Sequence, residues 1–238
     1  MELNSFQEKM RHFLPEVELR FAEPMSRHTS LRIGGPAEVM AFPQNPQELA
    51  HILKVTKELD ITCAILGAGT NILAPDEGCR GLIICLKDCL GGMELLPGNC
   101  IRVMAGVTMA RAAVFAANHG LSGLEFAHGI PGTVGGGVYM NAGAYGGEMS
   151  GICRSVTLMD GAGQLREVNA RELEFSYRHS KLQESGEIVI SAVLQLQPAA
   201  PEEVKQKMRE LQAKRLASQP LDYPSAGSAF KRPAGGYA

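Results

Sequence analysis

The chain has 238 residues, of which 45% are hydrophobic and 20% are charged, and its formal net charge at pH 7 is -2. This composition is ordinary for a globular protein with a packed core, and the small net charge gives no electrostatic reason to expect nucleic acid or an anionic membrane as a partner. No apolar run reaches the length of a membrane span, and the N-terminal residues lack a signal-peptide core. We therefore predict a cytoplasmic protein.

The first part of the chain has the pattern of a strand, a helix and two further strands. Residues 37–43 (AEVMAFP) predict a strand, and Asn45 and Pro46 then supply an N-cap and a first-turn proline for a helix. The apolar runs at 61–66 and 82–86 predict two more buried strands. The chain is therefore expected to open with a β-α-β unit.

The rest of the chain mixes short strands with few helices, which predicts an α+β fold with a boundary near residues 198–201. Periodicity, turn residues and caps give the expected elements. They are a strand at 101–103, a helix from Thr108 to Gly120, a hairpin of RSVTLMD and LREV around the turn GAGQ, a strand at 187–197, and a charged helix from Pro201 to about Ser218.

The cysteines and histidines do not have the spacing of a metal site. The six cysteines include no C-x-x-C pair, and most lie in apolar surroundings such as LIICL. The six histidines form no H-E-x-x-H pattern. We predict reduced thiols and no bound metal.

A first glycine-rich loop, LGAGTNIL at 66–73, follows a predicted strand. The amides of such a turn can form an anion-binding nest. The loop is not a P-loop, since it lacks G-K-[S/T], and it lacks the G-x-G-x-x-G spacing of a Rossmann unit. On this pattern alone, a purely structural turn is the more common case.

A second glycine-rich stretch, residues 129–147, contains eight glycines. These glycines would let backbone approach a planar or diphosphate ligand without Cβ clashes, and Thr133, Tyr139 and Asn141 could add directional hydrogen bonds. A tight, glycine-packed crossing of two chain segments explains the same composition equally well. Both interpretations stand on the residues alone.

Five motifs together resemble the UDP-N-acetylenolpyruvoylglucosamine reductase family. They are TSLRIGGPAE (29–38), LGAGTNIL (66–73), GIPGTVGGGVYMNAGAYGGE (129–148), FSYRHS (175–180) and GSAFKRP (227–233). Their order and spacing match over nearly the whole chain, and the AGAYGGE form is similar to the shorter second subclass. The resemblance implies the FAD-binding fold of the vanillyl-alcohol-oxidase type. The implied divisions are an N-terminal segment (1–30), an FAD-binding domain (31–198, with subdomains 31–90 and 91–198) and the start of an α/β substrate-binding domain (199–238).

The resemblance also implies the cofactors and the residues that bind them. FAD would be held by glycine-rich backbone, and NADPH would be the reductant. The implied FAD-binding residues are Ile33, Gly34, Gly35, Leu66, Gly67, Ala68, Gly69, Thr70, Asn71, Gly129, Pro131, Gly132, Thr133, Gly135, Gly136, Asn141, Ala142 and Gly143.

The reaction implied is reduction of UDP-N-acetylglucosamine enolpyruvate to UDP-N-acetylmuramate for peptidoglycan synthesis. Arg178 would hold the substrate carboxylate and stabilise the enolate, and Ser228 would donate a proton to C2. Tyr177 and Lys231 would assist substrate binding. Without the resemblance, Arg178 is interpreted as a surface ion-pair partner of Glu172 or Glu174, and Ser228 as a turn residue after Gly227.

The family's members continue beyond the serine motif through a substrate-binding domain that carries a catalytic glutamate, whereas this sequence stops at Ala238. We therefore expect a C-terminally truncated chain in which Val204, Met208 and Leu211 form an exposed apolar face available for self-association. The alternative function is a truncated FAD-binding module without turnover. A related flavin oxidase is disfavoured because YRHS and GSAFKRP fit the reductase.

Overall fold

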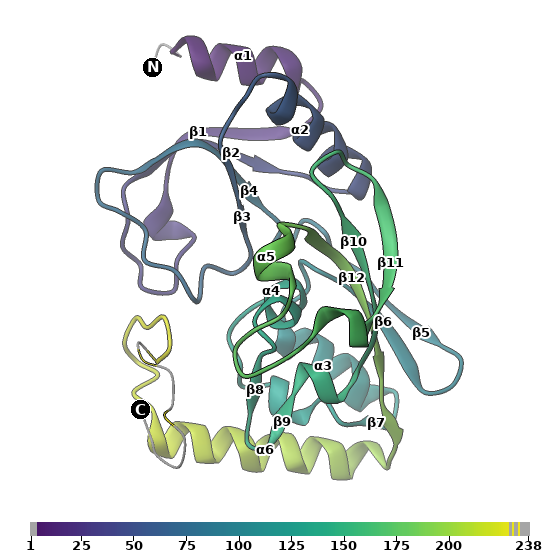
Figure 1. Cartoon of the computed structure of the whole chain (residues 1–238). Helices are drawn as coiled ribbons and strands as arrows, with labels where there is room; N and C mark the ends of the chain where they lie inside the picture. The colour runs from purple at the N-terminus through teal and green to yellow at the C-terminus, as the bar shows by residue number, and fades with distance from the viewer. Residues whose placement is uncertain (1–3, 229, 231–232, 234–238) are drawn as a thin grey trace.

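Two β-sheets joined side by side form the framework of the computed structural model, which describes residues 4–228, 230 and 233 (Figure 1). The first sheet has the order β1-β2-β4-β3. Its strands β2, β4 and β3 are parallel, and β1 pairs antiparallel with β2. The strand bounds are Glu18–Pro24 (β1), Pro36–Phe42 (β2), Cys63–Leu66 (β3) and Cys79–Cys85 (β4).

The second sheet has the order β11-β10-β12-β6-β5, and all of its neighbouring strands are antiparallel. Its long central strand β12 is buried along almost its whole length, as expected for a strand with elements packed on both faces. The strand bounds are Met93–Leu96 (β5), Cys100–Met104 (β6), Cys153–Met159 (β10), Leu165–Asn169 (β11) and Ile188–Gln195 (β12).

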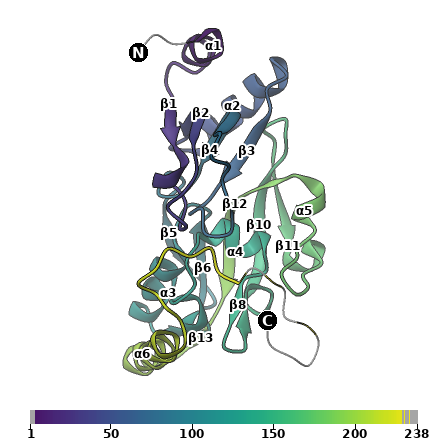
Figure 2. The same ribbon diagram turned by 90° about the vertical axis from the view of Figure 1, so that its left-hand side faces the viewer.

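Helices α1 and α2 lie at the end of the molecule farthest from α6 (Figure 2). The helices of four residues or more are α1 (Ser5–Phe13), α2 (Pro46–Glu58), α3 (Met109–Asn118), α4 (Val134–Tyr139), α5 (Leu182–Ser185) and α6 (Pro201–Ser218). Short 3-10 turns occur at Met25–Arg27 (η1), Glu125–Ala127 (η2), Met149–Gly151 (η3) and Ala170–Leu173 (η4). Two small ribbons pair β7 (Leu121–Ser122) with β13 (Gln197–Pro198) and β8 (Gly143–Ala144) with β9 (Gly147–Glu148).

One hydrophobic core lies between the first sheet and helices α1 and α2. Met10 of α1 and Ile52 of α2 are fully buried against Val39 and Ile84 of the sheet. The same cluster includes Ile190 of β12, so the core is continuous between the two sheets. The second sheet is therefore held to the first by shared apolar packing.

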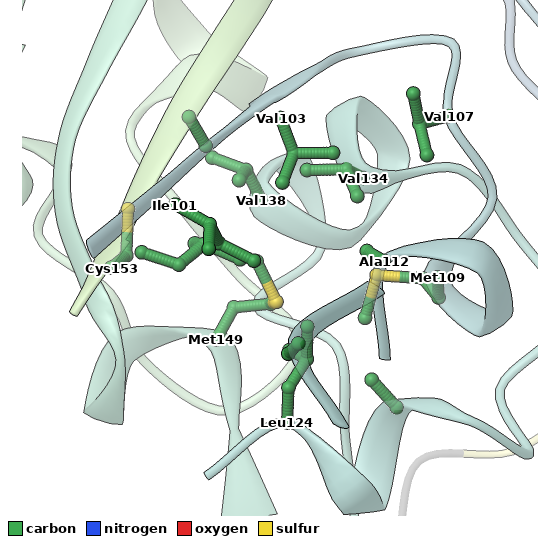
Figure 3. Packing of buried hydrophobic residues seen from close by; sticks show 14 of the residues in the cluster. Ile101, Val103, Val107, Met109, Ala112, Leu124, Val134, Val138, Met149 and Cys153 are labelled. Atoms are coloured by element: carbon green, nitrogen blue, oxygen red, sulfur yellow. The ribbon is translucent and has the colours of Figure 1, made fainter. Parts of the chain in front are cut away.

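A larger core lies between the second sheet and helices α3, α4 and α6. Figure 3 shows Val134 and Val138 of α4 lying close to Ile101 and Val103 of β6. All four side chains are completely buried. The glycine-rich helix α4 is thus fixed by its few valines, because its glycines have no side chains to bury.

The expected strands at 37–43, 61–66, 82–86 and 187–197 are confirmed to within a few residues. The hairpin of β10 and β11 is also confirmed, and Asp160 holds its turn by accepting from the amides of Ala162 and Gln164 at 2.8 and 2.9 Å. These hydrogen bonds lower the pKa of the Asp160 carboxyl. Strands β1 and β5 and the short helix α4 were not predicted from the sequence.

The expectation of an exposed apolar face on α6 is wrong. Val204, Met208 and Leu211 are only 3%, 6% and 9% exposed, and α6 packs against α3 and η2. The face is covered by the same chain because η2 and α3 form an apolar surface beside the second sheet. Self-association through this face therefore loses its structural basis.

We expect Met208→Ala to lower the free energy of unfolding by about 2–5 kcal/mol, because it leaves a cavity beneath α6. The matched control is Leu216→Ala on the same helix, where the leucine is 60% exposed and truncation should change stability by no more than about 0.5 kcal/mol. Urea unfolding measures both variants. Equal stability of the two variants would contradict the packing described for α6.

All six cysteines are free thiols. Burial raises the pKa of Cys153 to about 12 and the pKa of Cys89 to about 11. Within the described residues, no group of three or more His, Cys, Asp or Glu side chains is arranged to hold a metal ion. In the same part of the chain, no helix has both the length and the apolar character needed to cross a bilayer.

Because thiolate is the reactive form of cysteine, Cys89 and Cys153 should resist alkylation in the folded protein at pH 8. Both should react promptly once the protein is unfolded in guanidinium chloride. Mass spectrometry of iodoacetamide-treated protein, digested after quenching, assigns the labelled positions. Rapid labelling of Cys153 under native conditions would show that this thiol is not buried as described.

Candidate functional site

Two of the predicted loops contact each other directly at the end of the first sheet. The loop between η1 and β2 donates from Ser30 N to the carbonyl of Gly69 at 3.0 Å, and Ser30 Oγ donates to the same oxygen at 3.3 Å. Gly69 has φ +61°, and a Cβ on it would lie 1.9 Å from the carbonyl oxygen of His28. Glycine is therefore required at this position for both conformation and space.

The loop after β3 also contacts the loop that precedes α4. Thr70 Oγ1 donates to the carbonyl of Pro131 at 3.0 Å. A Cβ on Gly67 would lie 2.8 Å from Thr133 Oγ1. Three segments that the sequence analysis selected separately are thus brought together at the junction of the two sheets.

Hydrogen bonds to the residues that follow β6 fix the start of α4. Val134 N donates to Val107 O at 2.8 Å, and Gly135 N donates to Ala105 O at 2.9 Å. Thr133 is buried and caps α4, since its Oγ1 accepts from Gly136 N at 3.3 Å. The start of α4 is therefore anchored by the protein's own hydrogen bonds.

Most of the selected glycines are in contact with the protein itself. An added Cβ would lie 2.6 Å from Ala74 Cβ at Gly34, 2.1 Å from Asp76 O at Gly35, 2.8 Å from Ala105 Cβ at Gly135 and 2.7 Å from Gly147 O at Gly143. At these positions the interpretation as a glycine-packed crossing of segments is correct.

Two glycines are different because an added Cβ would make only an ordinary van der Waals contact there. The nearest atoms to an added Cβ lie at 3.5 Å for Gly132 and 3.6 Å for Gly136, and Gly136 is exposed. Beside them, the amides of residues 68–71 donate to no backbone carbonyl in the part of the chain that the structure describes. A row of unpaired amides next to bare backbone is a feature of the backbone nests that bind anionic groups.

The other residues expected to bind the cofactor differ in how exposed they are. Ile33 is 46% exposed, and Asn71 and Pro131 are exposed, whereas Ala68 is partly buried. Leu66 is only 4% exposed, so its side chain belongs to the core and only its backbone can face a ligand.

Asn141, Ala142 and Gly129 are engaged within the protein. Asn141 is 2% exposed, and both ends of its amide already have protein partners. Ala142 packs against the larger core. The carbonyl of Gly129 accepts from the guanidinium of Arg215 on α6, an anchoring contact that the sequence analysis missed.

Arg178 occupies a tight turn in which Ser176 and His179 exchange two backbone hydrogen bonds, both at 3.1 Å. Its Nη2 donates to the carbonyl of Gly143 at 3.2 Å, and its guanidinium carbon lies 5.5 Å from the ring centre of Tyr177. The nearby Glu174 pairs instead with Lys181. The interpretation of Arg178 as a simple surface ion-pair residue is therefore not supported.

Ser228 lies on the exposed segment that follows α6. This segment turns back toward the loops of the first sheet, and Ser225 N donates to Ser30 O at 3.2 Å (Figure 1). No hydrogen bond connects Ser228 with Arg178 within the described ranges. Lys231 lies outside the described residues.

Comparison with known proteins identifies the family. The family described as "FAD binding domain" matches residues 37–169. The UDP-N-acetylenolpyruvoylglucosamine reductase of Lactobacillus acidophilus is 46% identical over 92% of this chain and 73% of that protein. The reductase of Agathobacter rectalis is 43% identical over 98% of this chain and 78% of that protein. The chain belongs to the UDP-N-acetylenolpyruvoylglucosamine reductase family.

Solved structures agree with this assignment. The crystal structure of UDP-N-acetylenolpyruvylglucosamine reductase from Thermus caldophilus matches with a TM-score of 0.78 and 33% identity over 94% of this chain and 77% of that chain. The 6-hydroxy-D-nicotine oxidase of Arthrobacter nicotinovorans, at 16% identity and a TM-score of 0.60, shares the fold alone. The predicted α+β fold of the vanillyl-alcohol-oxidase type is confirmed, and the protein is a flavin-dependent oxidoreductase that binds FAD.

The residues at the loop junction fit this cofactor. Unpaired amides at 68–71 suit the pyrophosphate of FAD, and the open faces of Gly132 and Gly136 leave room beside them. The side chain of Asn141 does not fit the role of a cofactor ligand, because its polar atoms are used internally.

The neighbours Gly135 and Gly136 provide a matched test of which glycines face FAD. Gly136→Ala should stabilise the flavin-free protein by up to about 0.5–1 kcal/mol, because alanine favours a helix, and should weaken FAD binding if the cofactor lies on the open face. Gly135→Ala should instead lower stability by about 1–3 kcal/mol through overlap with Ala105.

Thermal unfolding of flavin-free protein and fluorescence titration with FAD measure the two effects separately. An unchanged FAD affinity in Gly136→Ala would place the cofactor away from this face of α4.

Proposed function

We propose that the protein catalyses NADPH-dependent reduction of UDP-N-acetylglucosamine enolpyruvate to UDP-N-acetylmuramate, in cytoplasmic peptidoglycan precursor synthesis. Support comes from the names of its relatives and from the position of Arg178, whose guanidinium is held at the carbonyl of Gly143 beside the glycine-rich loops. That position is the observation on which the proposal chiefly rests. In this proposal residues 31–198 bind FAD, and 199–238 begin the substrate-binding domain.

Arg178 would bind the carboxylate of the enolpyruvyl group. FAD, when bound and reduced by NADPH, supplies a hydride to C3 of this group, which leaves negative charge at C2 and on the carboxylate. A guanidinium is permanently charged and presents parallel donors that match a carboxylate. A donor aimed at developing charge typically contributes about 2.7–4 kcal/mol to lowering the barrier.

Ser228 would donate the proton that completes the reaction at C2. A serine hydroxyl is a weak acid in water, but a carbanion next to a carboxylate is a much stronger base, so transfer is favourable once the two groups are aligned. Tyr177, which is 52% exposed beside Arg178, would contact the same substrate. The family motif gives Lys231 a supporting role in substrate binding.

A second candidate function is an FAD-binding module without turnover. It is favoured by the exposure of Ser228 and by the lack of a hydrogen bond between Ser228 and Arg178 within the described residues. The visible spectrum of the purified protein distinguishes the two functions. A flavin band that bleaches with NADPH and returns with the enolpyruvyl substrate supports the reductase, whereas a band that stays bleached supports the inert module.

We expect Ser228→Ala to leave flavin bleaching by NADPH unchanged and to slow recovery of the band on adding substrate by about 10²–10⁴-fold. The control is Ser218→Ala, which removes an exposed hydroxyl from the end of α6. Stopped-flow absorbance follows both half-reactions. Recovery at the same rate in Ser228→Ala and in the control would remove Ser228 from the proton transfer.

A further inference from the structure

The turn that carries Arg178 has an unfavourable backbone conformation. Arg178 has φ +56°, in the left-handed region that bulky side chains seldom adopt. Such a conformation persists only when surrounding contacts impose it. The residues that make these contacts are therefore the ones that keep Arg178 in this conformation.

Asn141 holds the turn from one side. Its Nδ2 donates to the carbonyl of Ser176 at 3.0 Å, and its Oδ1 accepts from Ser150 N at 2.9 Å. At 2% exposure the side chain is shielded from water. Loss of its donor would leave the Ser176 carbonyl without this partner next to the start of the turn.

Ser180 and Gln183 hold the turn from the other side. Ser180 is completely buried, and its Oγ donates to the carbonyl of Tyr139 at 2.7 Å. Gln183 Nε2 lies 3.2 Å from the carbonyl of Tyr139 and 3.2 Å from the carbonyl of Arg178 itself. The two hydrogens of one amide can serve both carbonyls.

Three of these bonds, from Asn141 Nδ2, Ser180 Oγ and Gln183 Nε2, connect the turn and the residues after it to Tyr139 and Asn141, at the end of the glycine-rich helix α4. Arg178 adds its own bond to Gly143 O in the segment after α4. The position of the guanidinium is thereby fixed relative to the loop beside the proposed cofactor face, and not relative to the exposed hairpin of β10 and β11.

We infer that Asn141, Ser180 and Gln183 are positioning residues for Arg178, which fix its strained turn to the segment after α4. The inference rests on the proposed function, because it assigns these residues to the substrate-carboxylate site. None of the three is required to touch the substrate. Their effect on the reaction should therefore pass through Arg178.

Asn141→Asp is the central variant because it keeps the acceptor for Ser150 N but places an oxygen opposite the Ser176 carbonyl. We expect kcat/KM for the enolpyruvyl substrate to fall roughly 10- to 100-fold, since small misplacements of a catalytic group have effects of this size. Asn169→Asp is the matched control, because Asn169 caps η4 through its Oδ1 on the exposed surface, and this variant should retain full activity.

A double-mutant cycle separates positioning from general loss of structure. In an Arg178→Ala background, Asn141→Asp should change single-turnover rates by no more than about twofold, because its partner in catalysis is already gone. An equal fold-loss in both backgrounds would overturn the inference. Gln183→Glu, at an exposed site, provides the same cycle if Asn141→Asp fails to fold.

A measurement without flavin tests the inference independently of turnover. In the flavin-free protein, ¹⁵N relaxation at Nε of Arg178 should report greater mobility in Asn141→Asp than in wild type. Unchanged mobility together with unchanged kcat/KM would refute the positioning role. If Arg178→Ala itself retains full activity, the proposed function fails, while increased mobility in Asn141→Asp would still support the structural link.

Discussion

Direct contact between the loop that leaves β3 and the loops that precede β2 and α4 is the constraint on which the site depends. The carbonyl of Gly69 accepts two hydrogen bonds from Ser30, and the neighbouring Thr70 hydroxyl bonds to the carbonyl of Pro131. These contacts hold residues 68–71 with their amides unpaired. A side chain at Gly69 would overlap the His28 carbonyl and separate the loops, so this arrangement of residues 68–71 requires bare backbone at that position.

The glycines of the motif consequently serve two separate purposes. Gly135 lies against Ala105 and lets α4 approach the second sheet, whereas an added Cβ on the adjacent Gly136 would make only an ordinary van der Waals contact. Successive residues of a helix point about 100° apart, so one can face the core while the next faces a ligand. Of the two interpretations that the sequence left open, packing is therefore correct at Gly135, and ligand approach stays a prediction at Gly136.

Much of the fold was predictable because its signals are local. The apolar run of residues 188–195, the cap at Asn45 and the turn at Asp160 each act over a few residues. Helix α4 was not predictable from propensity, because its three glycines disfavour a helix and it is stabilised by packing of Val134 and Val138. The burial of the α6 face depends on η2, far away in sequence, which periodicity cannot reveal.

The candidate site shows the same limit. Glycine content located the two loops and motif resemblance located Arg178, but the resemblance also assigned Asn141 to the cofactor, because a polar residue in a glycine-rich motif resembles a ligand. The partner of its amide, Ser176, is 35 residues away, and only the folded chain brings them together.

The burial of Asn141 and Ser180 bears on how the fold maintains an unfavourable turn. A buried polar group without a partner costs about 1–3 kcal/mol, which is comparable to the cost of holding one residue in the left-handed region. Relaxing the turn at Arg178 would break bonds to Asn141 and Gln183 together, so the relaxed state is less favourable than the strained one. The same bonds end on the segment after α4. A shift of the glycine-rich loop would therefore displace Arg178 with it, and the fold keeps the distance between the loop and Arg178 constant.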